Sequence, residues 1–439
     1  MIKSSGLYYI DPFGCVKNQV DAENMMAHLN NSGWKNTTDA DLADIIIVNS
    51  CGFIESAKKE SIDAVLQWRR LYPQKKILLA GCLSQRYAQE LPGELPEADA
   101  FIGVENPAKI IEIISNNKFT KKKNKVLRTG ERPLLSLPGS AYVKISEGCN
   151  NNCSYCAIPL IRGGLVCREI PEIAEECRAL LNRGIKELCI IGQDIGSYHD
   201  GLQKLLKAIS ALEGNFWVRL LYIHPDHFPA EILDLIEKDT RFLPYFDIPF
   251  QHASEKILAA MNRRGNSEKY LELIKNIRAR LPNAVIRSTF LLGFPGETEE
   301  DFSALLDFQQ KAKLDWLGCF AFSREEGTAA YSMKNRVPAK TAAARKKIIE
   351  EKQIPITEKN TERFVNQTLD VLVEEKFTGN GGAENCEYIR LGRLYCQAPD
   401  IDGAAVIITH EESDEKLKLG TFIKCKVAAR RGFDLEVHI

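Results

Sequence analysis

The sequence predicts a multidomain α/β protein that ends in a small all-β domain. At 439 residues the chain exceeds one ordinary core, so roughly two to four domains are expected. Strand-like and helix-like segments alternate through the front and middle of the chain, which is typical of parallel sheets covered by helices. The last segment carries short alternating runs between glycine-rich turns, which is typical of a small β-barrel.

The composition narrows the class of protein. A content of 44% hydrophobic and 27% charged residues is that of a soluble globular chain. No apolar stretch is long enough to span a bilayer, and Met1–Tyr9 contains too short an apolar run for a secretory signal. We therefore expect a cytoplasmic protein without a membrane partner. The net charge of −1 provides no general basic field for an extended nucleic acid.

Residues 1–117 predict a flavodoxin-like parallel α/β domain. Its strand candidates are nearly continuous apolar runs, as in sheets buried on both faces. They are Leu7–Ile10, Ala43–Ser50 and Lys76–Gly81. A segment that contains Lys121, Lys122, Lys123 and Lys125 follows, and we interpret residues 118–134 as a solvated linker.

Each of these three strand candidates leads into a cysteine, namely Cys15, Cys51 or Cys82. Because parallel strands share one carboxyl edge, the three thiols should converge there. A small residue beside each cysteine leaves room for a bulky inorganic cluster. A catalytic nucleophile or a disulfide is the alternative interpretation.

Residues 135–365 predict a partial (β/α)6 barrel with a trailing helix. Amphipathic helical patterns separate six strand candidates. These are Ala141–Ser146, Lys186–Gly192, Phe216–Ile223, Tyr245–Phe250, Ala284–Gly293 and Trp316–Ser323. In such barrels the chemistry lies at the carboxyl ends of the strands.

Directly after the first of these strands comes the motif C-x3-C-x2-C, formed by Cys149, Cys153 and Cys156. Three thiolates this close can hold three corners of a [4Fe–4S] cube, which leaves the fourth iron open to a small-molecule ligand. Zinc is the alternative, although no second cysteine pair or nearby histidine completes a zinc site. A non-enzymatic binding module built on zinc-bound cysteines therefore stays open as a second class of function.

The other cysteines and the histidines give weaker signals. Cys177, Cys189, Cys319 and Cys425 lie among apolar neighbours and predict small buried side chains. Cys386 and Cys396 give no signal, and Cys167 is ambiguous because it closely follows the motif. For His252 at a strand end, a cofactor contact and a core role are both open. We interpret His224 and His227 as loop residues, with metal binding as the alternative.

The C-x3-C-x2-C loop after the first strand of a six-unit barrel resembles the radical S-adenosylmethionine (SAM) superfamily. The resemblance implies that the open iron binds SAM and that reductive cleavage of SAM gives a radical able to take hydrogen from carbon. Two strand ends, Ile190–Asp194 and Arg287–Glu297, suit a SAM pocket. The residues that we expect to contact SAM are Tyr155, Gln193, Gln251, Ser288 and Gly293.

The front domain together with this barrel resembles the methylthiotransferase family over essentially the whole chain. The resemblance implies a TRAM-like β-barrel over residues 366–439 and a second [4Fe–4S] cluster, held by Cys15, Cys51 and Cys82, that delivers sulfur. It also implies two SAM equivalents, one for the radical and one for the methyl group. A low-potential electron donor such as flavodoxin or ferredoxin is implied as a partner.

Two subfamilies compete: MiaB-type enzymes modify an isopentenyladenosine in tRNA, and RimO-type enzymes modify the β-carbon of an aspartate in small-subunit ribosomal protein twelve. The stretches Gly52–Ser61, Asp247–Ala253 and Arg287–Phe290 look closer to the RimO type. The segment Val166–Glu169 departs from the usual R-S-R-P, which leaves the role of Cys167 open.

The charge of residues 366–439 supports the same choice. They contain 13 acidic and 9 basic residues, so their net charge is −4 (9 − 13). A barrel that binds nucleic acid should present a basic groove, whereas an acidic one suits a basic ribosomal protein or the ribosomal subunit. A merely solvated surface is the alternative, and tRNA is the alternative substrate.

Overall fold

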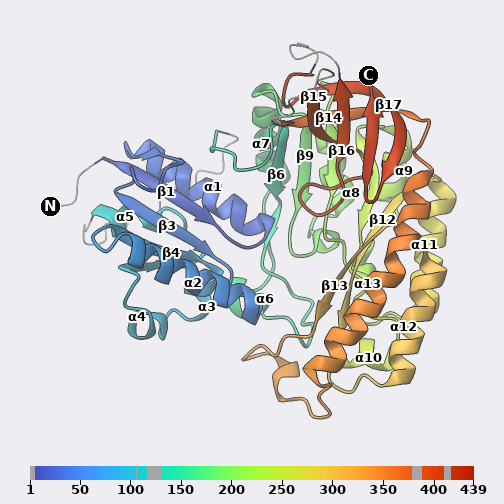
Figure 1. Cartoon of the computed structure of the whole chain (residues 1–439), viewed down its shortest axis with the longest axis horizontal. Coiled ribbons are helices and arrows are strands. Elements are labelled where there is room, and N and C mark those ends of the chain that lie inside the picture. The colour runs from blue at the N-terminus through green and yellow to red at the C-terminus, as the bar shows by residue number, and fades with distance from the viewer. Residues whose placement is uncertain (1–4, 105, 116–130, 378–387, 410–416) are drawn as a thin grey trace. The chain divides into compact units, whose positions relative to one another are not determined.

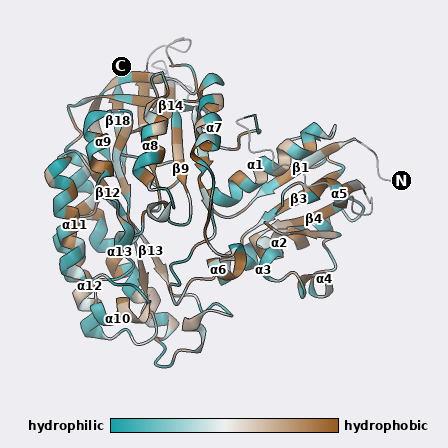
Figure 2. Ribbon diagram, turned by 180° about the vertical axis from the view of Figure 1, so that it is seen from behind, coloured by the Kyte–Doolittle hydropathy of each residue, from teal (hydrophilic) through white to brown (hydrophobic). Residues whose placement is uncertain are grey.

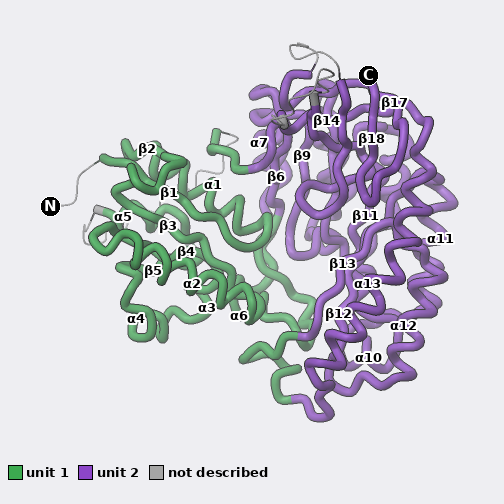
Figure 3. Tube along the Cα trace, viewed as in Figure 1, with its two compact units in different colours: residues 1–135, 146–167, 323–332 green, residues 136–145, 168–322, 333–439 purple. Residues whose placement is uncertain are grey.

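The computed structural model describes residues 5–104, 106–115, 131–377, 388–409 and 417–439 (Figure 1). The chain forms two compact units (Figure 3). Unit 1 comprises residues 1–135, 146–167 and 323–332, and unit 2 comprises 136–145, 168–322 and 333–439. The loop with the C-x3-C-x2-C motif thus belongs to unit 1. The four linker lysines and Cys386 lie outside the described residues.

Unit 1 is built on a parallel five-stranded sheet in the order β2-β1-β3-β4-β5. This is the flavodoxin-like strand order, as expected. The strands are β1 (Leu7–Pro12), β2 (Lys35–Asn36), β3 (Ile45–Ser50), β4 (Lys76–Gly81) and β5 (Ala100–Ile102). The helices are α1 (Val16–Asn31), α2 (Glu55–Leu71), α3 (Cys82–Arg86), α4 (Leu91–Glu94) and α5 (Lys109–Ser115).

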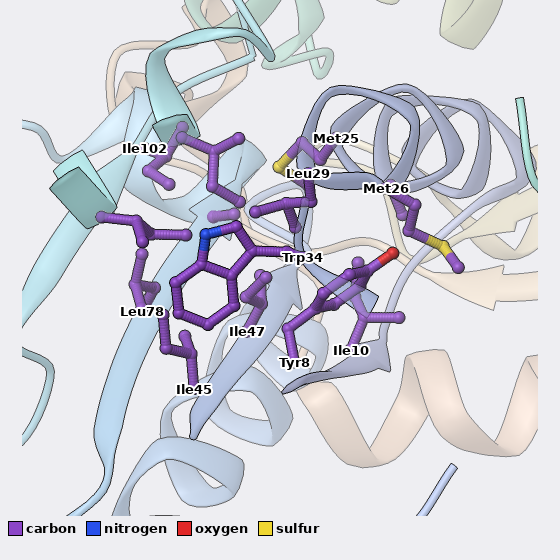
Figure 4. Close-up of a cluster of buried hydrophobic side chains, with 14 residues drawn as sticks. Tyr8, Ile10, Met25, Met26, Leu29, Trp34, Ile45, Ile47, Leu78 and Ile102 are labelled. Atoms are coloured by element: carbon purple, nitrogen blue, oxygen red, sulfur yellow. The ribbon is translucent and has the colours of Figure 1, made fainter. Parts of the chain in front are cut away.

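Both faces of this sheet are buried, which explains the continuous apolar runs. Ile45 and Ile47 of β3 pack with Trp34 and the α1 side chains Met25 and Leu29 in one cluster (Figure 4). The intervening residues of β3, at positions 46 and 48, belong to a second cluster with residues of α2 and α3. Successive strand residues point to opposite faces, so a sheet covered on both sides needs apolar residues at every position.

Two further segments complete unit 1. Strands β7 (Ser146–Glu147) and β8 (Val166–Cys167) pair antiparallel and close the loop that carries the second cysteine trio and α6 (Ile158–Arg162). The segment 323–332 contains η3 (Ala329–Ser332), and its Ala330 N–H donates to the carbonyl of Ser154 over 2.7 Å. Glu325 of this segment forms ion pairs with Lys58 of α2 and Arg86 of α3.

Unit 2 contains a parallel six-stranded sheet in the order β13-β12-β11-β10-β9-β6. All six expected strands are confirmed. They are β6 (Ser140–Lys144), β9 (Glu187–Ile191), β10 (Trp217–Leu220), β11 (Phe242–Asp247), β12 (Val285–Leu292) and β13 (Trp316–Ala321). The open strand order agrees with a partial barrel that does not close.

Helices and short turns connect these strands. They are α7 (Ile170–Asn182), η1 (Ile195–Ser197), α8 (Leu202–Ser210), η2 (Pro225–His227), α9 (Ile232–Lys238), α10 (Glu255–Ala260), α11 (Ser267–Arg280), α12 (Glu299–Ala312) and α13 (Ala339–Glu362). Helix α12 begins at a capping box in which Thr298 and Asp301 bond to each other's backbone N–H. In Figure 2, α11 and α12 alternate between hydrophilic and hydrophobic stretches, as expected of helices with one face on a sheet.

The end of the chain forms a closed five-stranded barrel in the order β14-β15-β16-β18-β17. Its strands are β14 (Thr368–Phe377), β15 (Tyr388–Leu394), β16 (Ala405–Thr409), β17 (Phe422–Arg431) and β18 (Asp434–His438). The expected small barrel is therefore confirmed. Across the described part of the chain, no helix combines the length and apolar character that crossing a membrane requires.

Buried charges join this barrel to the amino ends of the six-stranded sheet within unit 2. The fully buried Glu187, the first residue of β9, accepts from Arg219 Nε over 2.7 Å and is also paired with Arg393 of β15. Arg393 in turn lies 2.6 Å from Glu374 of β14. Tyr245 of β11 donates to Asp402, in the loop before β16, over 2.6 Å. The C-terminal barrel thus covers the end of the sheet opposite to its carboxyl edge.

Candidate active site

The front cysteine trio lies at the carboxyl ends of three neighbouring strands. Cys15 is the residue before α1, Cys51 follows β3 directly, and Cys82 is the first residue of α3 after β4. Strands β1, β3 and β4 are adjacent in the sheet, so the three residues share one edge. The structure therefore brings together the thiols that the strand pattern predicted to converge. Their role as cluster ligands stays a prediction.

Glycines beside these cysteines allow the strand ends to approach closely. Gly81 has φ +100°, and an added Cβ would lie 2.6 Å from the carbonyl oxygen of Ser50. A Cβ at Gly52 would lie 2.7 Å from the carbonyl oxygen of Cys82. A side chain at either position would force the cysteine-bearing segments apart. The small residues thus serve the approach of the backbone as well as leaving space.

Arg162, at the end of α6, reaches the front trio from the loop that carries the second trio. Its side chain is 1% exposed, and its Nη2 donates to Cys82 Sγ over 3.1 Å. The same nitrogen donates to Asp21 Oδ2 over 2.9 Å and to Asn18 Oδ1 over 2.5 Å. Nη1 donates to Glu147 Oε1 over 2.8 Å. One buried cation therefore contacts residues next to both cysteine trios.

Asn18, in the first turn of α1, connects the three strand ends. Its side-chain N–H donates to the carbonyl of Ser50, next to Cys51, over 2.8 Å. The Cys82 thiol donates to its oxygen over 3.1 Å. Asn49, at the end of β3, donates its side-chain N–H to the Asn18 carbonyl over 2.8 Å. Side-chain bonds of this kind hold the cysteine-bearing segments together.

Burial acts on the thiols of this trio. It raises the pKa of Cys82 to about 12, although the positive charge of Arg162 works in the opposite direction. Burial also raises the pKa of Cys51. A cysteine binds metal as its thiolate. A cluster that binds here therefore displaces the thiol protons, and the charge of Arg162 favours the thiolate form of Cys82.

The second trio lies in the loop between β7 and α6. All three cysteines are partly exposed. The Cys149 N–H donates to the carbonyl of Gly163 over 3.2 Å, and that of Cys156 to Cys153 over 3.0 Å. Cys167 pairs with Ser146 in the two-stranded ladder at the base of the loop. Cys167 therefore closes the loop, apart from the motif itself.

The donor sets fit clusters with three protein thiolates each. No three His, Cys, Asp or Glu side chains in the described ranges are grouped tightly enough to hold a single metal ion. Thiolate sulfur is the protein ligand that iron–sulfur cubes take, so the donor type of each trio suits a cube. The first trio comes from three adjacent strand ends and the second from one short loop.

In unit 2, three of the residues expected to contact SAM follow the carboxyl ends of strands, and the fourth lies within a strand. Gln193 follows β9, and Gln251 follows β11 with φ +68° and a backbone bridge to Phe290. Ser288 is fully buried within β12, and its hydroxyl accepts from the Phe250 N–H over 3.1 Å. Gly293 has φ +76°, and a Cβ there would lie 2.4 Å from Ala342 of α13. Ser288 and Gly293 thus have structural contacts of their own. The assignment of all four residues, and of Tyr155, to SAM stays a prediction.

A polar cluster at the same edge was not predicted from the sequence. Asp194 is 2% exposed, and its Oδ2 lies 2.9 Å from His227 Nδ1 and 2.7 Å from Ser197 Oγ. The hydrogen bond to Asp194 raises the pKa of His227, against the effect of burial. His224 caps η2, and burial lowers its pKa to about 4. The alternatives predicted for these histidines were a loop role and metal binding. The positions of both agree with the loop role.

His252 is a fully buried histidine of unit 2. Its Nδ1 accepts from the Ser254 N–H over 3.0 Å, and burial lowers its pKa to about 4. Glu297, 3.7 Å away, accepts from Gly293 N–H and pairs with Arg345. These contacts favour the core role. The cysteines at 177, 189, 319 and 425 are buried as expected, and so is Cys396.

Family models match three segments of the chain. The Radical SAM superfamily matches residues 143–308, Uncharacterized protein family UPF0004 matches residues 7–103, and the TRAM domain matches residues 365–439. The first match covers the cysteine loop and most of the six-stranded sheet, the second the front sheet, and the third the closed barrel.

Curated relatives match nearly the whole chain. Ribosomal protein uS12 methylthiotransferase RimO of Treponema denticola is 46% identical, over 97% of this chain and 99% of its own length. The protein of the same name from Syntrophomonas wolfei is 40% identical, over 96% and 97% respectively. The chain belongs to the ribosomal protein uS12 methylthiotransferase family. Membership in it confirms the resemblance that the two cysteine trios, the barrel and the C-terminal strands indicated.

A solved structure supports the fold of this uS12 methylthiotransferase family member. The radical SAM methyltransferase TsrM from Kitasatospora setae superposes with a TM-score of 0.58 at 14% identity, over 86% of this chain and 81% of its own. At that identity the likeness shows the fold alone. The arrangement as an α/β multidomain protein with a radical SAM sheet is thereby confirmed.

Proposed function

We propose that the chain adds a methylthio group to the β-carbon of an aspartate in ribosomal protein uS12, as a radical SAM enzyme with two [4Fe–4S] clusters. The curated relatives are named for methylthiotransfer to this protein, and they match over nearly their full length. The structural observation that carries the proposal is the presence of two separate cysteine trios in one compact unit. A single cluster would need only one of them.

The two cysteine trios would hold two different clusters. Cys149, Cys153 and Cys156 would hold one cluster, and the trio at the front sheet, Cys15, Cys51 and Cys82, would hold the other. When bound, these groups and SAM would supply hydrogen abstraction from carbon and a source of sulfur. Asn18 and Arg162 would position the front thiols through their hydrogen bonds to the Ser50 carbonyl and to Cys82 Sγ.

The polar edge of unit 2 would bind the substrate. Asp194 fixes the tautomer and orientation of His227, whose side chain is 43% exposed at the carboxyl edge. A histidine with a raised pKa can donate a hydrogen bond to a carboxylate. Such a group suits a substrate whose reacting residue is an aspartate. The reaction would use two SAM equivalents per turnover, one for the radical and one for the methyl group.

The partners follow from this chemistry. The acidic C-terminal segment, at −4 over residues 366–439 from 13 acidic and 9 basic residues, suits a basic ribosomal protein better than tRNA. Reductive cleavage of SAM needs a low-potential donor such as flavodoxin or ferredoxin. A ribosomal substrate places the enzyme in the cytoplasm.

An anaerobic reconstitution and activity assay tests the proposal. We expect about eight irons per chain, and about four after replacement of Cys15, Cys51 and Cys82 by alanine. With SAM and a reductant, mass spectrometry should show a methylthio adduct on uS12 and none on tRNA nucleosides. An iron content of about four in the parent would contradict the two-cluster assignment. Modified tRNA with unmodified uS12 would replace the substrate by the alternative one.

A further inference from the structure

Arg162 is a buried cation in unit 1 that is not a ligand in either cluster assignment. Its side chain is 1% exposed, and the side chains of its partners Asp21 and Glu147 are 7% and 29% exposed. Burying a guanidinium is costly unless it is fully paired, and two carboxylates already supply the countercharge. The 3.1 Å contact with Cys82 Sγ is therefore an additional interaction that charge pairing alone does not require.

The position of Arg162 in the chain links the two trios. It lies six residues after Cys156, and its partner Glu147 lies two residues before Cys149. Its other partners, Asn18 and Asp21, lie on the helix that begins after Cys15. One guanidinium thus anchors both sides of the loop with the second trio to the helix next to the first.

A permanent positive charge at this distance acts on a cluster electrostatically. Arginine stays protonated at every accessible pH, and an N–H donor to a ligand sulfur stabilises the more negative, reduced form of a cluster. Burial makes the effect larger, because water does not screen the charge.

We propose that Arg162 is a positioning residue that raises the reduction potential of the cluster held by Cys15, Cys51 and Cys82 and fixes the loop of the other trio beside it. The inference rests on the proposed function, since it requires that a cluster binds at the front trio. It concerns the protein's own side chain, so its effect is measurable without turnover.

An EPR-monitored redox titration of the full chain tests this. With Cys149, Cys153 and Cys156 replaced by alanine, the front cluster is observed alone. We expect Arg162→Gln to shift its midpoint potential to a more negative value, and Arg162→Lys to retain most of the parent value because the charge stays. Arg86→Gln is the control for the loss of a buried arginine: Arg86 pairs with Glu325 and donates to the Gly52 carbonyl rather than to a thiol, so a smaller shift than that of Arg162→Gln is expected.

The outcomes separate the possible failures. An unchanged midpoint in Arg162→Gln, at parental iron content, would overturn the role of Arg162 while leaving the proposed function intact. Loss of front-site iron in Arg162→Gln but not in Arg162→Lys would support it, because charge is then needed to hold the cluster. Equal loss of iron in both variants would overturn it in favour of a purely steric role. A parent that binds no iron at the front trio would contradict the proposed function itself.

Discussion

Glu325 and Arg86 form a buried ion pair, with Arg86 Nη1 2.6 Å from Glu325 Oε2. Lys58 Nζ lies 2.9 Å from the same oxygen, and Ser323 donates to the other one over 2.6 Å. Glu325 belongs to the segment 323–332, which follows the last strand of the unit 2 sheet but packs in unit 1. This carboxylate therefore ties the segment to α2 and α3, the helices that follow Cys51 and Cys82.

Glu325→Gln should destabilise unit 1 by about 3–5 kcal/mol, because the buried Arg86 and the partly exposed Lys58 lose their countercharge. Urea denaturation monitored by circular dichroism would measure this. The exposed Glu326→Gln, one residue along, is the control and should change stability by less than about 0.5 kcal/mol. Burial raises the pKa of Glu325, but hydrogen bonds from Ser323, Lys58 and Arg86 outweigh this and lower it. Its contribution should be present above the unfolded-state pKa and lost as pH falls through the folded one.

Gly81→Ala should disturb the front trio. The backbone at Gly81, with φ 100° and ψ −155°, lies in a region that is essentially restricted to glycine, and the added Cβ would meet the Ser50 carbonyl. We expect a loss of stability of about 1–3 kcal/mol from strain and less iron bound at the front trio. Iron analysis and urea midpoints would show both effects.

Gly93→Ala is the matched control, because nothing lies within 4 Å of a Cβ at that position. It should leave both measurements unchanged. Full iron binding and parental stability in Gly81→Ala would show that the strand ends do not need this close approach.

Strands that consist of apolar runs could be predicted from the sequence. The strands that were missed show where prediction from the sequence pattern fails. Strands β2 and β5 contain two and three residues, too few for a period to show. Strand β15 is hard to recognise in the sequence because it carries two buried arginines, Arg390 and Arg393, which are 4% and 3% exposed. Arg393 can be buried because Glu187, 206 residues earlier in the chain, and Glu374 both pair with it.

The site divides in the same way. The six cysteines could be found because their chemistry is evident from residue type, spacing and the ends of strands. Arg162 could not be found, because its partners Asn18 and Asp21 lie more than 140 residues away in the sequence. The one signal in the sequence was the polar first turn of a helix that follows a cysteine. Such a turn does not show that Arg162 is its partner.

Glu187→Gln should weaken the junction between the sheet of unit 2 and its C-terminal barrel. The carboxylate is fully buried between Arg219 and Arg393, and its removal leaves both cations without their shared partner. We expect a loss of about 3–5 kcal/mol by urea denaturation. Glu375→Gln, at an exposed position of β14, should have little effect. A variant at Glu187 with parental stability would mean that Glu374 alone compensates both arginines.

Acid should reveal the same junction. Burial opposes ionisation of Glu187, but Arg393 and Arg219 lower its pKa to about 2. A depressed folded-state pKa means that the stabilisation is present above the unfolded-state value and is lost as pH falls towards 2. The stability difference between the parent and Glu187→Gln should therefore narrow between about pH 4 and pH 2, the lower limit being that folded-state value.

Asp194→Asn should lower the pKa of His227. The hydrogen bond between Asp194 Oδ2 and His227 Nδ1, together with the negative charge, stabilises the imidazolium, and an amide provides no charge. Titration of the His227 ring signals by NMR would measure the shift. Asp200→Asn is the control, because Asp200 is not among the groups that act on His227. Because the folded-state pKa is raised, the stabilisation from this contact should be complete below the unfolded-state pKa and lost as pH rises through the folded one. A His227 pKa that does not respond to Asp194→Asn would show that the carboxylate serves only to cap η1 through the Gly196 N–H.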